Sequence, residues 1–142
     1  MLNADDAAVV RMASRTLARV EWFGLAETAD VRAFDIEATA SGTSFTLTVR
    51  GATRRVQLRI LGEHHVMNAL AAIAATAALG VPVERSVPAI ERLARAERWR
   101  MEVLPRPDGV VVINDAYNAS PDSMAAALKT LAQVTRANQR SV

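Results

Sequence analysis

Three stretches between residues 34 and 60 alternate apolar with polar side chains. This period of two is typical of β-strands that pack one face against a core and leave the other face in water. Two short segments that contain glycine, Ser41–Thr43 and Arg50–Ala52, separate the stretches and predict turns. The apolar members are Phe34 and Ile36, then Phe45, Leu47 and Val49, then Val56, Leu58 and Ile60. The sequence therefore predicts a three-stranded antiparallel meander in the middle of the chain.

Helical patterns surround this meander. Asn3–Asp6 offers capping side chains at the start of the helix predicted before the meander. Gly80 and Pro82 predict the end of the helix that follows the meander. A short strand is expected at Arg19–Phe23. Because proline is tolerated only in the first turn of a helix, Pro88 favours a late start for the helix after Pro82. The predicted helices cover residues 6–16, 64–79 and 83–96.

The last third of the chain begins a second unit. Met101–Leu104 is expected to form a strand, and Pro105–Gly109 has the composition of a linker. Val110–Ile113 is a continuous β-branched run, which predicts a buried parallel strand. Ser120–Pro121 supplies an N-cap and a first-turn proline to a helix that ends near Thr135. A strand, a loop and a helix in this order normally begin an α/β domain.

Composition excludes several classes of protein. The chain has 142 residues, a formal net charge of +2 and no cysteine, so disulfides and thiolate metal sites are excluded. Of the 17 basic residues 16 are arginine, but no aromatic residues are interleaved with them, so nucleic-acid binding is not favoured. The longest apolar run, Ala69–Val81, is shorter than the roughly 20 residues of a membrane span. The N-terminus lacks the pattern of a signal peptide, so we expect a cytoplasmic protein.

Three polar clusters carry possible chemistry. His64, His65 and Asn68 lie on the first turns of an otherwise apolar helix, where free N–H groups can help to line a nucleotide pocket. Arg100 enters a strand, where its guanidinium could bind a phosphate with two hydrogen bonds. Asn114–Asn118 follows a strand whose carboxyl end is a ligand-binding position in open α/β sheets. From the residues alone, helix caps and a surface ion pair are the simpler interpretations of the first two clusters, and a turn remains an alternative for the third.

Four segments together resemble the Mur ligase family. They read Asn-Ala-Asp-Asp, Gly-Glu-His-His-Val-Met-Asn-Ala-Leu-Ala-Ala, Arg-Trp-Arg-Met-Glu and Asn-Asp-Ala-Tyr-Asn-Ala-Ser-Pro-Asp-Ser-Met, in the order and with the spacing of that family. The resemblance covers nearly the whole chain. It implies an α/β fold in which residues 1–106 are the C-terminal part of the central, ATP-binding domain, with helices and an antiparallel meander. Residues 107–142 would then be the first βα unit of a Rossmann-like C-terminal domain.

The resemblance also implies an activity and roles for individual residues. The last motif is similar to the family branch that uses ATP and Mg²⁺ to add D-alanyl-D-alanine to UDP-N-acetylmuramoyl-tripeptide, through an acyl phosphate, in peptidoglycan synthesis. By position, His65 and Asn68 would lie by the adenine, Arg100 would reach the ATP phosphates and Asp115 would approach the ribose. Tyr117 and Asn118 would line the interdomain cleft near the incoming dipeptide. Arg100 and Asp115 are expected to contribute to catalysis more than to folding.

The sequence departs from the family in three ways. The family often has asparagine where this chain has His65, and Ser120 replaces the usual second asparagine of the last motif. The chain contains no Gly-x-x-Gly-Lys-[Ser/Thr] phosphate loop, and no acidic residue is in place to hold magnesium, so no metal ligand is assigned. We therefore expect an enzyme fragment that is inactive alone and binds no nucleotide tightly. The alternatives are a fragment of another Mur or folylpolyglutamate-type ligase, or a non-catalytic binding module.

Overall fold

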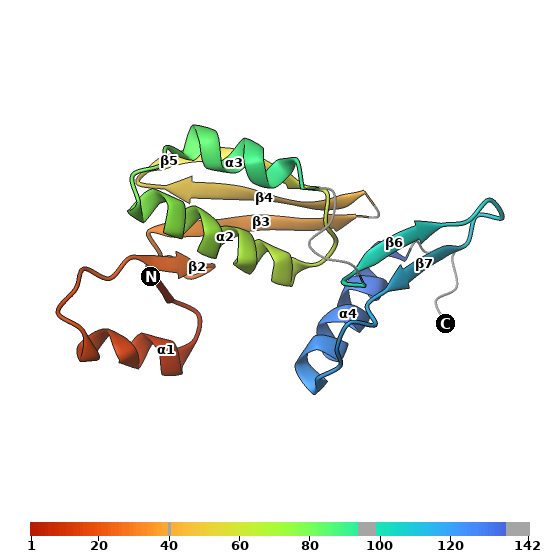
Figure 1. Ribbon diagram of the computed structural model, residues 1–142, viewed down its shortest axis with the longest axis horizontal. Helices are drawn as coiled ribbons and strands as arrows, with labels where there is room; N and C mark the ends of the chain where they lie inside the picture. The colour runs from red at the N-terminus through yellow and green to blue at the C-terminus, as the bar shows by residue number, and fades with distance from the viewer. Residues whose placement is uncertain (40, 94–98, 136–142) are drawn as a thin grey trace.

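The structure is a computed structural model, and it describes residues 1–39, 41–93 and 99–135. Most of the chain forms a mixed five-stranded sheet with helices on one face, and a β-hairpin with a helix follows at the far end (Figure 1). The sheet order is β1-β2-β3-β4-β5. The strands are β1 (Leu2–Asn3), β2 (Trp22–Gly24), β3 (Val31–Thr39), β4 (Gly42–Val49) and β5 (Ala52–Leu58).

The antiparallel meander predicted for the middle of the chain is confirmed. β3 pairs with β4 and β4 with β5 in antiparallel register, whereas β1, β2 and β3 are mutually parallel neighbours. Arg50 and Gly51 form the two-residue connection between β4 and β5, and both have positive φ angles, of 50° and 83°. A two-residue hairpin loop of this kind requires that conformation because it matches the twist of the flanking strands.

Two helices cover one face of the sheet. α2 (Glu63–Ala78) agrees with the predicted helix, and α3 (Val83–Glu91) begins at the first residue of its predicted range but ends at Glu91, so the prediction that it continues to Ala96 is wrong. α2 buries one apolar stripe, in which Val66, Leu70 and Ile73 are fully buried against the strands. Burying each such side chain contributes about 1.5–3 kcal/mol to stability. This core fixes the N-terminal end of α2, where the first polar cluster lies.

A β-bulge changes the predicted pattern of β3. The register with β4 shifts between Phe34 and Glu37, and Asp35 within the bulge has a φ of 49°. Val31 and Ala33 therefore face the core, whereas Phe34 lies half-buried on the other face beneath the Arg32 guanidinium. The prediction that Phe34 and Ile36 share the core face is wrong for Phe34. Arg55 stabilises the bulge, because its Nη1 donates to the Asp35 carbonyl oxygen at 2.7 Å.

Two helical boundaries also differ from the prediction. The first helix is α-helical only over α1 (Ala7–Arg11) and continues as a 3₁₀ turn, η1 (Met12–Arg15). α3 begins at Val83 rather than later, with Pro88 inside it. The carbonyl group that Pro88 leaves without an N–H partner belongs to Glu84, which is an exposed residue. Within the described ranges, no helix has the length and apolar content to cross a bilayer.

The last third of the chain folds as a hairpin and a helix. β6 (Glu102–Pro105) pairs antiparallel with β7 (Val111–Asn114), and α4 (Pro121–Val134) follows. The prediction of a buried parallel strand is therefore wrong: within the described residues β7 pairs with β6 alone, in antiparallel register, and Val111 and Val112 are more than 40% exposed. Between β6 and β7 the Arg106 N–H donates to the Val110 carbonyl oxygen at 2.9 Å, so the predicted linker forms a hairpin turn.

Candidate functional site

The first wall of the site is the N-terminal turn of α2. Gly62 precedes this helix with a φ of 104°, and a Cβ atom there would lie 2.6 Å from the Cε1 atom of His64. Glycine is therefore required on both conformational and steric grounds. His64 and Asn68 are four residues apart and lie on the same side of the helix, as predicted, while His65 is 94% buried beneath them.

The two histidines at this wall form a close pair. Their ring centroids lie 4.1 Å apart, and the Nε2 atom of His65 is buried without a hydrogen-bond partner in the described part of the chain. Burial, together with the neighbouring His64 and Arg100 charges, lowers the pKa of His65 to about 4. Burial also lowers the pKa of His64, although the Asp115 carboxylate opposes the shift. Both imidazoles are therefore neutral at pH 7 and can each donate and accept one hydrogen bond.

The second wall is built around Arg100. Trp99 and Met101, on either side of it, have φ angles of 64° and 46°, a conformation that bulky residues rarely adopt. The loop after β7 holds this segment: Asp115 Oδ1 accepts from the Met101 N–H at 3.1 Å, and the Tyr117 N–H donates to the Trp99 carbonyl oxygen at 3.2 Å. The Arg100 guanidinium carbon lies 4.3 Å from the centroid of the Tyr117 ring.

The third wall is the N-terminal end of α4. Ser120 caps the helix as predicted, and it exchanges hydrogen bonds with Ser123 in a reciprocal capping box. The sequence predicted a capping role for Ser120 but not its place in the site, and it did not predict Asp122, Ser123 or Ala126 there. The Ser120–Pro121 start signal could have identified them, because the first turn of a helix presents N–H groups to whatever lies in front of it.

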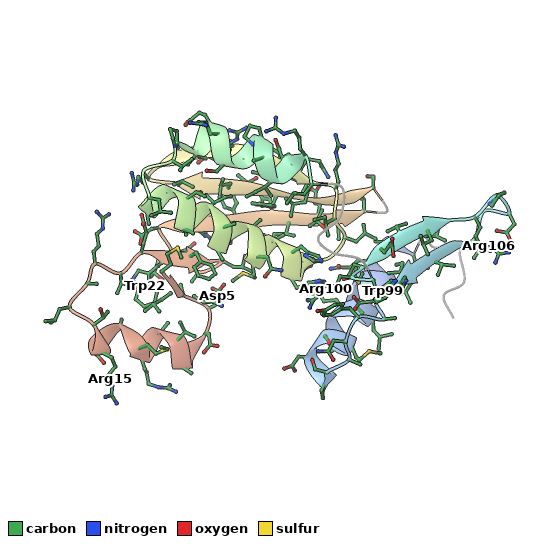
Figure 2. All side chains as sticks on the ribbon, viewed as in Figure 1. Asp5, Arg15, Trp22, Trp99, Arg100 and Arg106 are labelled. Carbon is green, nitrogen blue, oxygen red and sulfur yellow. The ribbon has the colours of Figure 1, made fainter. Side chains whose placement is uncertain are left out.

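These three walls enclose one cavity of about 410 Å³. Figure 2 shows Trp99 and Arg100 where the hairpin and α4 meet the end of α2, far from Arg106 at the hairpin tip. The cavity brings together every residue predicted as a binding residue, and its first segment lies more than 30 positions in sequence from the others. The lining residues are His64, His65, Asn68, Arg100, Asp115, Tyr117, Asn118, Ser120, Asp122, Ser123 and Ala126.

α4 closes the cavity by packing on the start of α2. Thr130 is buried and lies against Gly62, where an added Cβ atom would come within 3.2 Å of its hydroxyl oxygen. Glu63 accepts hydrogen bonds from Lys129 Nζ at 2.6 Å and from Gln133 Nε2 at 2.7 Å. The Lys129 ammonium group holds the pKa of Glu63 below its usual 4.5. The spacing of the cavity walls therefore depends on contacts between α2 and α4.

Chemically, the cavity combines a cation, an anion, neutral imidazoles and amides. This set suits a ligand with an aromatic or polar ring and an anionic group, such as a nucleotide. In the part of the chain that the structure describes, no three His, Cys, Asp or Glu residues are grouped to hold a metal ion. The cavity residues therefore fit a nucleotide but do not by themselves supply a magnesium site.

Family models match both parts of the chain. The Mur ligase middle domain matches residues 1–76, which is more than half of the chain, and the glutamate ligase domain of Mur ligases matches residues 99–142. The chain belongs to the Mur ligase family. The two matches correspond to the two units of the fold. The first covers the sheet with most of α2, and the second covers the hairpin with α4.

Two curated relatives of this chain carry the same name. The UDP-N-acetylmuramoyl-tripeptide–D-alanyl-D-alanine ligase of Mycobacterium bovis is 43% identical over 135 residues, and that of Mycobacterium leprae is 38% identical over 146 residues. Each match covers 94% of this chain but 26% and 28% of the relative. The chain therefore spans about a quarter of the length of the Mur ligases that it matches.

Solved Mur ligase structures have the same fold. MurF from Acinetobacter baumannii superposes with a TM-score of 0.84 at 31% identity, over 94% of this chain and 29% of that one. MurF from Thermotoga maritima in complex with ADP superposes with a TM-score of 0.77 at 22% identity, over 91% of this chain and 29% of that one. These neighbours confirm the mixed α/β architecture predicted from the sequence.

Proposed function

We propose that this chain is part of an ATP-dependent ligase that adds D-alanyl-D-alanine to UDP-N-acetylmuramoyl-tripeptide in the cytoplasm. The observation that carries the proposal is the convergence of the six predicted binding residues on one cavity. The 43% identity to a ligase of that name supports the choice of substrates. The other substrates and partners would be small molecules, and no part of the proposal requires a nucleic acid or a membrane.

ATP would occupy the cavity between α2 and the hairpin. His65 and Asn68 would contact the adenine, Asp115 the ribose and Arg100 the phosphates, while Tyr117 and Asn118 would face the dipeptide. Asp115 uses one carboxylate oxygen on the Met101 N–H, and its second oxygen remains to accept from a ribose hydroxyl group. ATP would supply the phosphoryl group that activates the tripeptide carboxylate, and the dipeptide amine would displace phosphate from it.

The domain boundary of the proposed enzyme also lies within this chain. The division predicted from the sequence, after residue 106, falls in the turn between β6 and β7. Since these strands pair along their whole length, we propose that the hairpin and α4 belong together to the C-terminal domain. Residues after α3 would then connect the two domains. The start of the second family match at residue 99 supports this division.

A chimaera tests the proposed function. The matching segment of the Mycobacterium tuberculosis ligase, which is 43% identical, would be replaced by this chain. We expect phosphate release from ATP that depends on both UDP-N-acetylmuramoyl-tripeptide and D-alanyl-D-alanine, and a large loss of that activity in Arg100→Ala and Asp115→Ala chimaeras. Phosphate release that requires diaminopimelate would instead assign the chain to the sister ligases. The corresponding Lactiplantibacillus plantarum enzyme is 34% identical to the chain. A well-folded chimaera without either activity would contradict the proposal.

A further inference from the structure

The loop after β7 holds the segment that carries Arg100 in a strained conformation. Left-handed φ angles at two bulky residues, Trp99 and Met101, persist only where surrounding contacts over-determine them. The contacts here come from residues 115–117: the Asp115 carboxylate holds the Met101 N–H, and the Tyr117 N–H holds the Trp99 carbonyl group. Met101 is also buried, with 3% of its surface exposed, and this burial helps to hold the segment in place.

The same loop also contacts the side chain of Arg100. The Tyr117 ring lies 4.3 Å from the guanidinium carbon, well within the distance of about 6 Å at which a cation is attracted to an aromatic face. A guanidinium group stacked on a ring interacts through its planar face, so its N–H donors at the edge are not used by the ring. Both side chains line the same cavity. Tyr117 therefore acts on Arg100 through its backbone N–H and through its ring.

We propose that Tyr117 is a positioning residue, which holds the Arg100 guanidinium over the cavity so that its N–H edge meets the phosphates of a nucleotide. This role goes beyond the dipeptide contact expected from the sequence, and its binding part rests on the proposed function. It predicts that the aromatic ring matters and the phenol hydroxyl does not. The matched variants are thus Tyr117→Phe, which keeps the ring, and Tyr117→Leu, which removes it.

NMR of the 142-residue chain tests the positioning without any ligand. The ring current of Tyr117 should shift the Arg100 δ-CH₂ and Nε–H protons upfield in the wild type and in Tyr117→Phe, and the shift should vanish in Tyr117→Leu. Phe34→Leu is the control. Arg32 stacks on Phe34 at 5.2 Å on the far face of the sheet and outside the cavity, so this variant should leave the Arg100 shifts unchanged. Unchanged core amide signals would show that each variant is folded. Arg100 shifts that are the same in wild type and Tyr117→Leu would overturn the proposal.

Titration with inorganic pyrophosphate then tests the consequence for binding. We expect Tyr117→Leu to weaken pyrophosphate binding by roughly three- to tenfold, and Tyr117→Phe to leave it within about twofold. In an Arg100→Ala background, Tyr117→Leu should have no further effect, because the residue through which it acts is gone. An equal loss in both backgrounds would contradict positioning. If the wild type binds no pyrophosphate while the ring-current pattern holds, the phosphate assignment fails and the positioning of Arg100 stands.

Discussion

The Nζ atom of Lys129 lies 2.6 Å from the Oε2 atom of Glu63, so the only lysine of the chain joins α4 to the first residue of α2. Gln133 adds a second hydrogen bond to the same carboxylate. His64 and His65 follow Glu63 directly on one wall of the cavity, and Ala126 on another wall lies three residues before Lys129. The pair therefore influences the shape of the cavity although neither side chain lines it.

This ion pair should contribute modestly to stability and be sensitive to salt. The Lys129 side chain is 61% exposed, so a double-mutant cycle of Lys129→Met and Glu63→Gln should give a coupling energy of about 0.5 kcal/mol. The coupling should fall at high ionic strength because exposed charges are screened. The Arg106–Asp108 pair at the hairpin tip is the control, because it joins two residues of the same turn and does not connect separate elements. Urea unfolding provides the measurement, and a coupling energy of zero would show that the ion pair adds nothing to the docking of α4.

The buried His65 should make stability depend on pH. Its pKa is lowered from 6.5 to about 4 in the folded chain, so between these values the unfolded state binds a proton that the folded state does not. The free energy of unfolding should therefore fall as pH decreases from 6.5 to about 4, by up to about 3 kcal/mol. His65→Asn should reduce this slope, because an amide does not titrate. Urea midpoints at several pH values test this, and parallel slopes for both proteins would contradict it.

Asp115 should contribute to folding as well as to binding, which changes the expectation drawn from the sequence. Removing its carboxylate in Asp115→Ala leaves the Met101 N–H without its partner, at a cost of about 1–3 kcal/mol. Asp115→Asn keeps an acceptor oxygen and should be closer to the wild type. Arg100→Ala, at an exposed position, should change stability by less than about 1 kcal/mol. Thermal melting of the three variants distinguishes the outcomes, and equal stability of Asp115→Ala and wild type would contradict this prediction.

The isolated chain should not hydrolyse ATP. Phosphoryl transfer depends on charges placed around the γ-phosphate, and the chain contains no phosphate-loop sequence to supply them. A sensitive phosphate-release assay should therefore give the buffer rate, while the chimaera described above serves as the positive control. ATP turnover that co-purifies with the chain and disappears in Arg100→Ala would show that the cavity alone is sufficient.

Much of the fold follows from local sequence signals. The alternation at Phe45, Leu47 and Val49 predicts β4, the Ser120–Pro121 pair predicts the start of α4, and Gly80 predicts the end of α2. Each of these signals depends only on neighbouring residues. The bulge at Asp35 has no such signal, because it is stabilised by Arg55 from another strand.

The pairing of β6 with β7 was harder to predict for a related reason. A run of valines such as Val110–Val112 looks the same in a parallel strand and in an exposed hairpin, and only the partner strand distinguishes them. The six predicted site residues were found from motif resemblance. Their convergence could not be predicted, since it depends on Thr130 and Glu63 docking α4 on α2.

The walls of the cavity belong to two folding units. A molecule bound in the cavity therefore couples the unfolding of one unit to the unfolding of the other. Glu63–Asn68 belongs to the sheet unit and residues 100–126 to the hairpin unit, so a molecule bound between them contacts both. Such a molecule binds only the docked arrangement, and by mass action it stabilises the docking itself. Calorimetry of the free chain would then show a hairpin unit that melts before the sheet unit. With the cavity filled, the two transitions would merge into one, and the ligand would have become part of the protein's tertiary structure.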